Sequence, residues 1–352
     1  MNGFTRLLFL SIALAAVSCN DRFTSVTLAD APVVPGTGTW IPFVGDDFED
    51  TSWGFTHNHP KSSRENDEQT RFPRGWSTNG RFFEGPERGQ PDSMEVVPLH
   101  GQGLPGSEHG LLVRTLNSGI PGRHSYKVEQ DDLIVDCVTR LGGPIPVSEV
   151  PNVVARIYLP PAEAWENRYG PHFGFRGTTT TTVTKTNPAS GRGRFRSRST
   201  TTTELEPYWP GMWVHFRPQA TSDGGAAQTA FIKVRGNRLG HDFLVKEIPE
   251  LGTWWTLGMS FTGDGMVHYY AKQGVEDLTE QDYLTSQYPY GFRAQKFETF
   301  FFNFCNKDDG KTWSTPIVID DPQLFLVHAN RVNSIVRNKE AAIERQAQMR
   351  AR

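Results

Sequence analysis

Residues Trp254–Lys272 read WWTLGMSFTGDGMVHYYAK, and this stretch predicts a β-hairpin. In its second half, Met266–Lys272, apolar residues alternate with basic or aromatic ones. Side chains two positions apart share a face of a strand, so His268, Tyr270 and Lys272 are expected on the same face. The pattern is typical of antiparallel sheets that bury one face and leave the other in solvent.

Two other stretches show the same alternation: Met212–Arg217 (MWVHFR) and Val153–Tyr158 (VVARIY). Their polar residues are expected on solvated faces: Trp213, His215 and Arg217 in the first stretch, Arg156 and Tyr158 in the second. If these strands are neighbours in one sheet, their polar faces merge into one surface. Such a surface suits a sugar chain that carries carboxylates or sulfates. The alternative is that these are the ordinary residues of a sheet facing solvent.

The composition favours one large all-β domain. The chain has 352 residues, with 24 prolines, 34 glycines and 23 phenylalanines. Short strand-like runs broken by turn residues favour a sandwich or barrel, and we expect the domain to cover residues 41–328. Helical periodicity is convincing only at Asn333–Ala351, within a charged C-terminal region, residues 329–352. A net charge of −3 argues against a general nucleic-acid binder.

The N-terminus predicts export. Residues 1–18 combine a short basic start with eleven mostly apolar residues and the small residues of a cleavage site. Eleven apolar residues are too few to span a bilayer, which takes about 20. Cys19 resembles the lipid acceptor of a bacterial lipoprotein, and ordinary cleavage near Ser18 is the alternative. Residues 19–40 are expected to form a tether to the membrane.

The remaining cysteines are Cys137 and Cys305. In an exported protein two cysteines can pair, and a bridge here would tie an early strand to a late one. Two buried free thiols are the alternative. No Cys/His cluster has zinc spacing.

A threonine-rich segment, Thr178–Thr203, predicts a long β-ribbon, because threonine favours extended backbone and its Gly-rich centre favours reversal. Four arginines alternate at its tip: Arg192, Arg194, Arg196 and Arg198. They could clamp an anionic polymer; a solvated loop is the alternative.

Residues Asn306–Trp313, NKDDGKTW, resemble the Asp-box pattern, with Asn306 in place of its serine. In proteins that carry the pattern it shapes a β-hairpin, with Asp and Gly in the turn and Trp beneath. We expect a structural role here. Only one copy is present, which argues against a sialidase-type propeller.

An early DDFED (Asp46–Asp50) and a late TPIVIDDPQLFLV (Thr315–Val327), with the hairpin between them, resemble the concanavalin A-like lectin/glucanase superfamily over residues 43–328. The resemblance implies a jelly roll of two antiparallel sheets, one of which forms a groove for sugars. The long threonine ribbon is not part of the common pattern.

The superfamily includes glucanases, which carry paired carboxylates as Glu-x-Asp-x-x-Glu on one strand. That motif is incomplete here. Glu129 and Asp131 are followed by Ile134 where the second glutamate is needed, and Glu280 and Asp282 are followed by Thr285. A glucanase of this type is therefore disfavoured.

Jelly-roll lyases need a base, an acid and a group that neutralises a uronate. His215 and Tyr270 are the candidate catalytic base and acid. The resemblance implies a Gln-x-His string in such lyases, and this chain keeps the histidine without the glutamine. Arg217, Arg176, Lys272 and Asn303 could neutralise the carboxylate, and His172 should share a face with Arg176.

The alternatives are a binding module without chemistry and a structural envelope protein. In a binding module Trp213, Tyr158 and Tyr270 would stack on sugar rings while arginines bind charged groups. The candidate binding residues are Arg156, Tyr158, His172, Arg176, Trp213, Arg217, His268, Lys272 and Asn303.

The expected partner is an anionic polysaccharide, without nucleic acid, and with membrane contact only through a lipid. No cofactor is required. Calcium is a candidate ligand if Asp46, Asp47, Asp320 and Asp321 converge, because calcium favours oxygen ligands.

Overall fold

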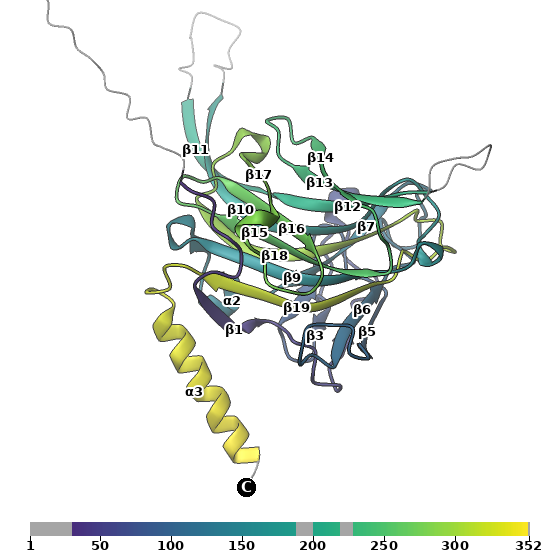
Figure 1. Cartoon of the computed structure of the whole chain (residues 1–352). Coiled ribbons are helices and arrows are strands. Elements are labelled where there is room, and N and C mark those ends of the chain that lie inside the picture. Colours follow the sequence, from purple (N-terminus) through teal and green to yellow (C-terminus); the bar gives the residue numbers. More distant parts are fainter. Residues whose placement is uncertain (1–29, 188–199, 219–227, 351–352) are drawn as a thin grey trace, which may run out of the picture.

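The computed structural model describes residues 30–187, 200–218 and 228–350. It is an all-β jelly-roll sandwich of two antiparallel sheets, which confirms the predicted fold class (Figure 1). The signal segment, Cys19 and the four arginines at the ribbon tip lie outside the described residues. None of the helices in the described part is long and apolar enough to cross a membrane.

The first sheet, sheet A, contains the hairpin at Trp254–Lys272, whose two strands pair from Trp255 with Gln273 to Phe261 with Val267. Its strand order is β17 (Tyr283–Gln287), β16 (Val267–Gln273), β15 (Thr253–Phe261), β9 (Pro151–Leu159), β19 (Ile317–Leu326), β6 (His109–Arg114) and β5 (Ser93–Pro98). The strand β1 (Thr39–Gly45) also pairs with β19, so the early and late segments meet as predicted.

The second sheet, sheet B, has the order β14 (Asp242–Ile248), β13 (Thr229–Arg235), β12 (Gly211–Arg217), β10 (Gly170–Asn187), β18 (Lys296–Asn306), β7 (Glu129–Val135), β4 (Phe82–Glu84), β3 (Trp76–Ser77) and β2 (Phe55–Thr56). Two further strands pair at its side, β11 (Thr200–Tyr208) with β10 and β8 (Ile145–Pro146) with β18.

The core lies between the sheets and is rich in aromatic side chains. Phe173 and Phe175 of β10 stack on Phe302 of β18, with ring centroids 6.0 and 5.6 Å apart. Met259 and Ile157 of sheet A belong to the same buried cluster. Because alternate residues of each strand enter this core, the residues between them must lie on the two outer faces.

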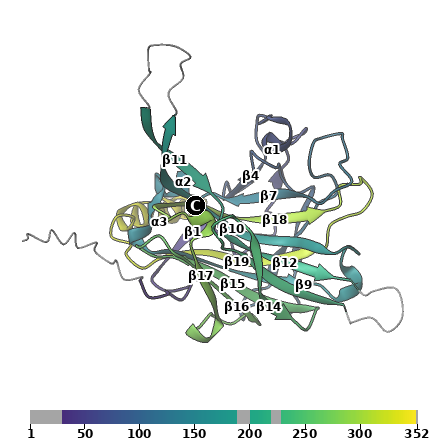
Figure 2. The ribbon, with the colours of Figure 1, turned by 90° about the horizontal axis from the view of Figure 1, so that it is seen from above.

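The threonine ribbon is present. The strands β10 and β11 pair without a break from Thr179–Tyr208 to Asn187–Thr200. The ribbon projects from the body of the sandwich in both views (Figures 1 and 2). Both of its strands belong to sheet B.

The helices are few. The two short ones are α1 (Arg64–Asp67) and α2 (Val138–Leu141), and α3 (Asn333–Arg350) is the predicted C-terminal helix. Four 3-10 turns are Val147–Glu149, Ala162–Ala164, Glu280–Asp282 and Pro289–Gly291. Val332 and Val336 are buried at the start of α3, which joins that end of the helix to the body.

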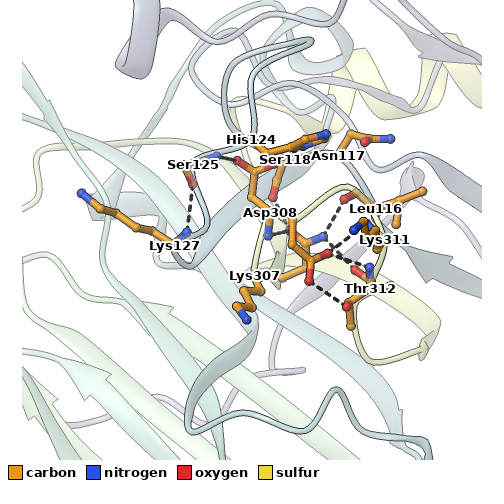
Figure 3. A network of polar contacts seen from close by, with 12 residues as sticks. Leu116, Asn117, Ser118, His124, Ser125, Lys127, Lys307, Asp308, Lys311 and Thr312 are labelled. Carbon is orange, nitrogen blue, oxygen red and sulfur yellow. Dashed lines mark hydrogen bonds and ion pairs between the residues drawn. The ribbon is translucent and has the colours of Figure 1, made fainter.

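The Asp-box-like segment forms a loop rather than a hairpin, because it connects β18 of sheet B to β19 of sheet A. Its side chains bind loop backbone (Figure 3). The carboxylate of Asp308 accepts the amide of Ser125 at 2.7 Å, and that of Asp309 accepts the amide of Thr312 at 2.7 Å. Trp313 is 38% exposed and lies under the guanidinium of Arg114, so it is not packed in the core.

The disulfide predicted between Cys137 and Cys305 is absent: both are buried free thiols. The thiol of Cys137 lies 3.6 Å from the hydroxyl of Thr299 on β18. Cys305 is six residues further along that extended strand, a separation of roughly 20 Å. A disulfide requires Cα atoms within about 7 Å, so the two cannot pair in this fold.

The first described residues lie across the outer face of sheet A, although we expected them in a tether. The hydroxyl of Ser260 donates to the carbonyl of Val33 at 2.6 Å, and the amide of Gly36 donates to Asn152 at 2.8 Å. A Cβ on Gly258 would lie 2.6 Å from Pro35, so only glycine allows this approach. The packed body therefore begins before residue 41.

Candidate functional site

The strands that carry the predicted site lie in different sheets. β12 with Trp213 and His215 belongs to sheet B, whereas β9 and β16 with Arg156 and Tyr270 belong to sheet A. Met212, Val214 and Phe216 point into the core, as do Ile157 and Tyr269 of the other sheet. The polar residues therefore lie on opposite outer faces, and the predicted merged surface is wrong. His215 and Tyr270 cannot act on the same sugar within one chain.

On sheet A the predicted residues are covered by the protein itself. Arg156 is 3% exposed, and its guanidinium donates to Val275 (3.2 Å), Gln323 (3.1 Å) and Asp277 (2.7 Å). His268 is fully buried between the hydroxyls of Thr262 (2.8 Å) and Ser286 (2.6 Å). These contacts are those of structural residues.

The aromatic and lysine side chains of this face are also engaged. Tyr270 is 1% exposed, packs on the ring of Tyr283, and has its pKa raised to about 12 by burial. Tyr158 packs on the ring of Trp254. The ammonium of Lys272 donates to the carbonyl of Asp277 at 3.1 Å.

His172 does not share a face with Arg176. The pairing of β10 with β12 shifts between Pro171 and Phe173, which turns His172 toward Trp165 and Phe216 of the core. Its ring nitrogens bond to the hydroxyl of Thr315 (2.7 Å) and to the carbonyl of Arg168 (3.2 Å). Burial holds its pKa well below the usual range, so the imidazole is neutral and structural.

The outer face of sheet B carries a hollow of about 480 Å³. Its lining combines aromatic and charged side chains: Glu65, Glu87, Arg88, Gln130, Asp132, Arg176, Trp209, Trp213, Arg235, Tyr290 and Phe301. Pockets that enclose a drug-sized ligand have volumes of roughly 300–1,000 Å³. The hollow is therefore large enough for a small molecule. Of the predicted residues, Arg176 and Trp213 line this hollow.

Arg176 is the most unusual residue of the hollow. It is 7% exposed and its guanidinium lies 5.1 Å from the ring of Trp213 and 5.4 Å from that of Phe301. One nitrogen donates to the carbonyl of Trp209 at 3.1 Å, while Nε has no partner. Burial, and then repulsion from Arg235, lowers its pKa to about 10.

No carboxylate in the described part of the chain lies within 4.0 Å of the Arg176 guanidinium, which would make an ion pair. The neighbouring cation, Arg235, is paired with Asp242 at 2.8 Å and also donates to the hydroxyl of Tyr290 at 3.0 Å. A buried charge normally has a partner, because desolvation without one costs several kcal/mol, of order 5 or more. Arg176 instead has the carbonyl of Trp209 and the rings of Trp213 and Phe301 as its neighbours.

Asp132 and Asn303 lie together beside Arg176. The amide of Asn303 donates to Asp132 at 2.5 Å and the amide of Gln130 donates to the same oxygen at 3.1 Å. Burial raises the pKa of Asp132, while Arg88 and Arg176 oppose this shift. The side-chain oxygen of Asn303 is buried and has no hydrogen-bond partner.

His215 is on the same outer face but does not line the hollow. It is 8% exposed, stacks on Phe231 with ring centroids 5.2 Å apart, and has no hydrogen-bond partner at either nitrogen. Burial, and then Lys233, lowers its pKa to about 4, so the imidazole is neutral near pH 7. The guanidinium of Arg217 lies over the same ring, 5.0 Å from the centroid of Phe231.

Of the four aspartates considered for calcium, Asp46, Asp47 and Asp321 line one hollow, but their carboxylate oxygens do not gather within 4.8 Å of one another. Among the described residues, the group whose ligand atoms gather within 4.8 Å is Glu49, Glu108 and His109. One carboxylate oxygen of Glu49 already accepts the amides of Glu108 (2.8 Å) and His109 (3.1 Å). These contacts hold a loop, and they leave little capacity for an ion.

The sequence interpretation missed Asp132, Arg88, Trp209, Arg235 and Tyr290. Sequence alternation could have identified two of them. Arg235 ends the strand-like TAFIKVR, whose alternation places it on a polar face. In EQDDLIV, Asp132 lies between Asp131 and Leu133, so it takes the opposite face of the strand from these two residues. Tyr290 has a left-handed backbone (φ 60°) in an irregular turn, and no sequence pattern identifies it.

No protein-family profile and no curated protein sequence matches the chain. Solved structures are similar at low sequence identity. A carbohydrate esterase from a Shiga toxin-encoding bacteriophage has a TM-score of 0.36 and 11% identity, over 70% of this chain and 89% of that one. A β-glucanase catalytic domain from Podospora anserina has 0.34 and 9%, over 66% and 78%. An alginate lyase from Pseudomonas aeruginosa has 0.34 and 7%, over 67% and 87%. These likenesses are too distant to bear on the chemistry of the site.

Proposed function

We propose that this protein binds an anionic polysaccharide on the outer face of sheet B, with an acidic group of the sugar at Arg176. The observation that carries the proposal is the buried guanidinium of Arg176, which lacks an ion-pair partner in the described residues. A uronate carboxylate or a sulfate supplies the missing negative charge. Hydrogen bonds to charged groups are worth about 1.5–3 kcal/mol each.

The neighbours of Arg176 support a sugar rather than a small inorganic anion. Trp213, Trp209 and Tyr290 give the hollow aromatic surfaces, on which the C–H faces of sugar rings pack. Arg88, Gln130 and Asp132 add polar side chains to the lining, which suit the hydroxyls of a sugar. The hollow therefore offers both apolar and polar contacts to a pyranose that carries an acid.

The test is a calorimetric titration with a polyuronate, a sulfated polysaccharide and a neutral glucan. The proposal predicts binding of one or both anionic polymers, weakened by salt, and none of the neutral glucan. Arg176→Met should reduce the affinity by tenfold or more, since about 1.4 kcal/mol corresponds to tenfold. Arg217→Met is the matched control, an exposed arginine on the same face, and should change the affinity only slightly. Equal binding of neutral and anionic polymers contradicts the proposal, and binding of neither leaves the structural envelope role.

The alternative function, β-elimination, has weaker support. His215 does not line the hollow, and both of its ring nitrogens are buried. It lies four residues along β12 from Gly211, the residue that pairs with Arg176, which is a separation of about 13 Å. Tyr270 is on the other sheet. We therefore expect no rise in the ultraviolet absorbance of an unsaturated uronate when wild type is incubated with a polyuronate, and a rise would establish a lyase.

We also propose that the protein is exported and anchored through a lipid on Cys19, on the basis of the N-terminal sequence alone. Metabolic labelling with radioactive palmitate should mark the wild-type protein and leave Cys19→Ala unlabelled. Label retained in Cys19→Ala contradicts the anchor, and accumulation of the protein inside the cell contradicts export.

A further inference from the structure

A second hollow, of about 880 Å³, lies on the same face of sheet B, next to the hollow at Arg176. The two share four lining residues: Glu87, Asp132, Trp209 and Phe301. They are therefore neighbouring parts of one depression. Trp76, Phe83, Arg74 and Arg140 line the second hollow and have no role in the site described above.

The strand register connects the two hollows in a single row. Directly paired residues cross seven strands in the order Arg235, Gly211, Arg176, Phe301, Ile134, Phe83 and Trp76. Their strand neighbours enter the core, so all seven lie on the outer face. Six steps between strands of about 4.8 Å give a row of roughly 29 Å.

The far end of the row has the chemistry of a sugar platform. Trp76 is 62% exposed, and its neighbour Phe83 lies beneath the guanidinium of Arg74, 5.0 Å from the ring centroid. Arg140 has a buried Nε without a partner on the same hollow. An aromatic surface next to cations repeats the combination found at Arg176.

We propose that the ligand is a polymer that lies across the strands, with one acidic residue at Arg176 and a later sugar stacked on Trp76 and Phe83. This inference rests on the proposed function, because the occupant of the second hollow is the same chain. Arg176 and Trp76 are four strand steps apart, roughly 19 Å, so a monosaccharide or disaccharide at Arg176 does not reach Trp76. The protein therefore selects long internal stretches of an acidic polysaccharide rather than free acidic sugars.

The test is a calorimetric comparison of a disaccharide and an octasaccharide of the acidic polymer that binds best. The octasaccharide should bind at least tenfold more tightly. Trp76→Ala should weaken octasaccharide binding about five- to tenfold and leave disaccharide binding unchanged, since an aromatic contact is worth about 1 kcal/mol beyond buried area. Trp40→Ala is the matched control, a 48% exposed tryptophan near sheet A, and should change neither.

Equal affinity for the two lengths, or an equal loss for both in Trp76→Ala, overturns the inference. A different result would show that the proposed function itself is wrong. In that case Arg176→Met leaves the affinity for both oligosaccharides unchanged, whatever the effect at Trp76.

Discussion

The outer faces of the two sheets are built from strands of the same alternating pattern, but their polar groups have different fates. On sheet A, residues 30–38 and the segment after β16 cover Arg156, His268 and Tyr270, and the polar groups of all but Tyr270 bond inside the protein. On sheet B, Arg176, Trp213, His215 and Asn303 keep buried atoms without partners, and the first two line an open hollow. The same residue types are hydrogen-bonded inside the protein on one face and lie beside an open hollow on the other.

The largest expected contrast is between the two buried arginines. Arg156→Met removes three hydrogen bonds, to the half-buried Val275 and Gln323 and to the exposed carboxylate of Asp277, and should lower the free energy of unfolding by about 2–3 kcal/mol. Arg176→Met removes a buried cation without a partner and should change it by less than about 1 kcal/mol, or raise it. Urea denaturation of both variants measures the difference. Equal losses would mean that Arg176 is as structural as Arg156.

On the covered face, Trp254 and Asp320 also keep buried polar atoms without partners, and of the two only Asp320 can carry a charge. Its carboxylate is fully buried without a hydrogen-bond partner, and burial, followed by repulsion from Asp321, raises its pKa to about 7. A raised acidic pKa contributes stability below the unfolded value, near 3.8, and that contribution is lost as the pH rises through 7.

We therefore expect Asp320→Asn to raise the free energy of unfolding by about 2 kcal/mol at pH 8 relative to wild type, with the advantage shrinking at pH 5. Denaturation of both proteins at the two pH values measures this. An advantage that is the same at pH 5 and pH 8 contradicts the role of the ionised carboxylate.

Both faces contain a buried histidine whose protonation should lower the stability of the protein at acidic pH. Burial lowers the pKa of His215 and of His268 to about 4, from 6.5. A lowered histidine pKa contributes stability above pH 6.5 that is lost as the pH falls toward 4. The double variant His215→Phe and His268→Gln should lose less stability than wild type between pH 7 and pH 4. A pH dependence identical to wild type excludes both groups as its source.

Much of the fold follows from local pattern. Alternation in Met212–Arg217 correctly separates Val214 from His215, and threonine content correctly predicts the ribbon of β10 and β11. Sheet membership does not follow, because β12 and β16 carry the same alternation and the pairing of each is set by contacts distant in sequence. The sheet to which each strand belongs decides which polar residues lie on the same face.

The candidate site shows the same limit. Arg176 and Trp213 were found from alternation, but the row that joins them to Phe83 and Trp76 depends on the register between strands more than 90 residues apart in the chain, as between Arg176 and Phe83. The burial of Arg156 could not be foreseen either, because its partners come from a loop and from the neighbouring strand β19. Local sequence shows which face a side chain takes, and only the assembled sheets show what covers that face.

Hydrogen–deuterium exchange with and without the best-binding acidic polysaccharide tests the two-face account most directly. The account predicts slower exchange in peptides from β10, β12, β18 and β7 of sheet B, and unchanged exchange in β9, β15 and β16 of sheet A. Slower exchange confined to β9, β15 and β16 would contradict it, because the ligand would then occupy the face that the chain itself covers.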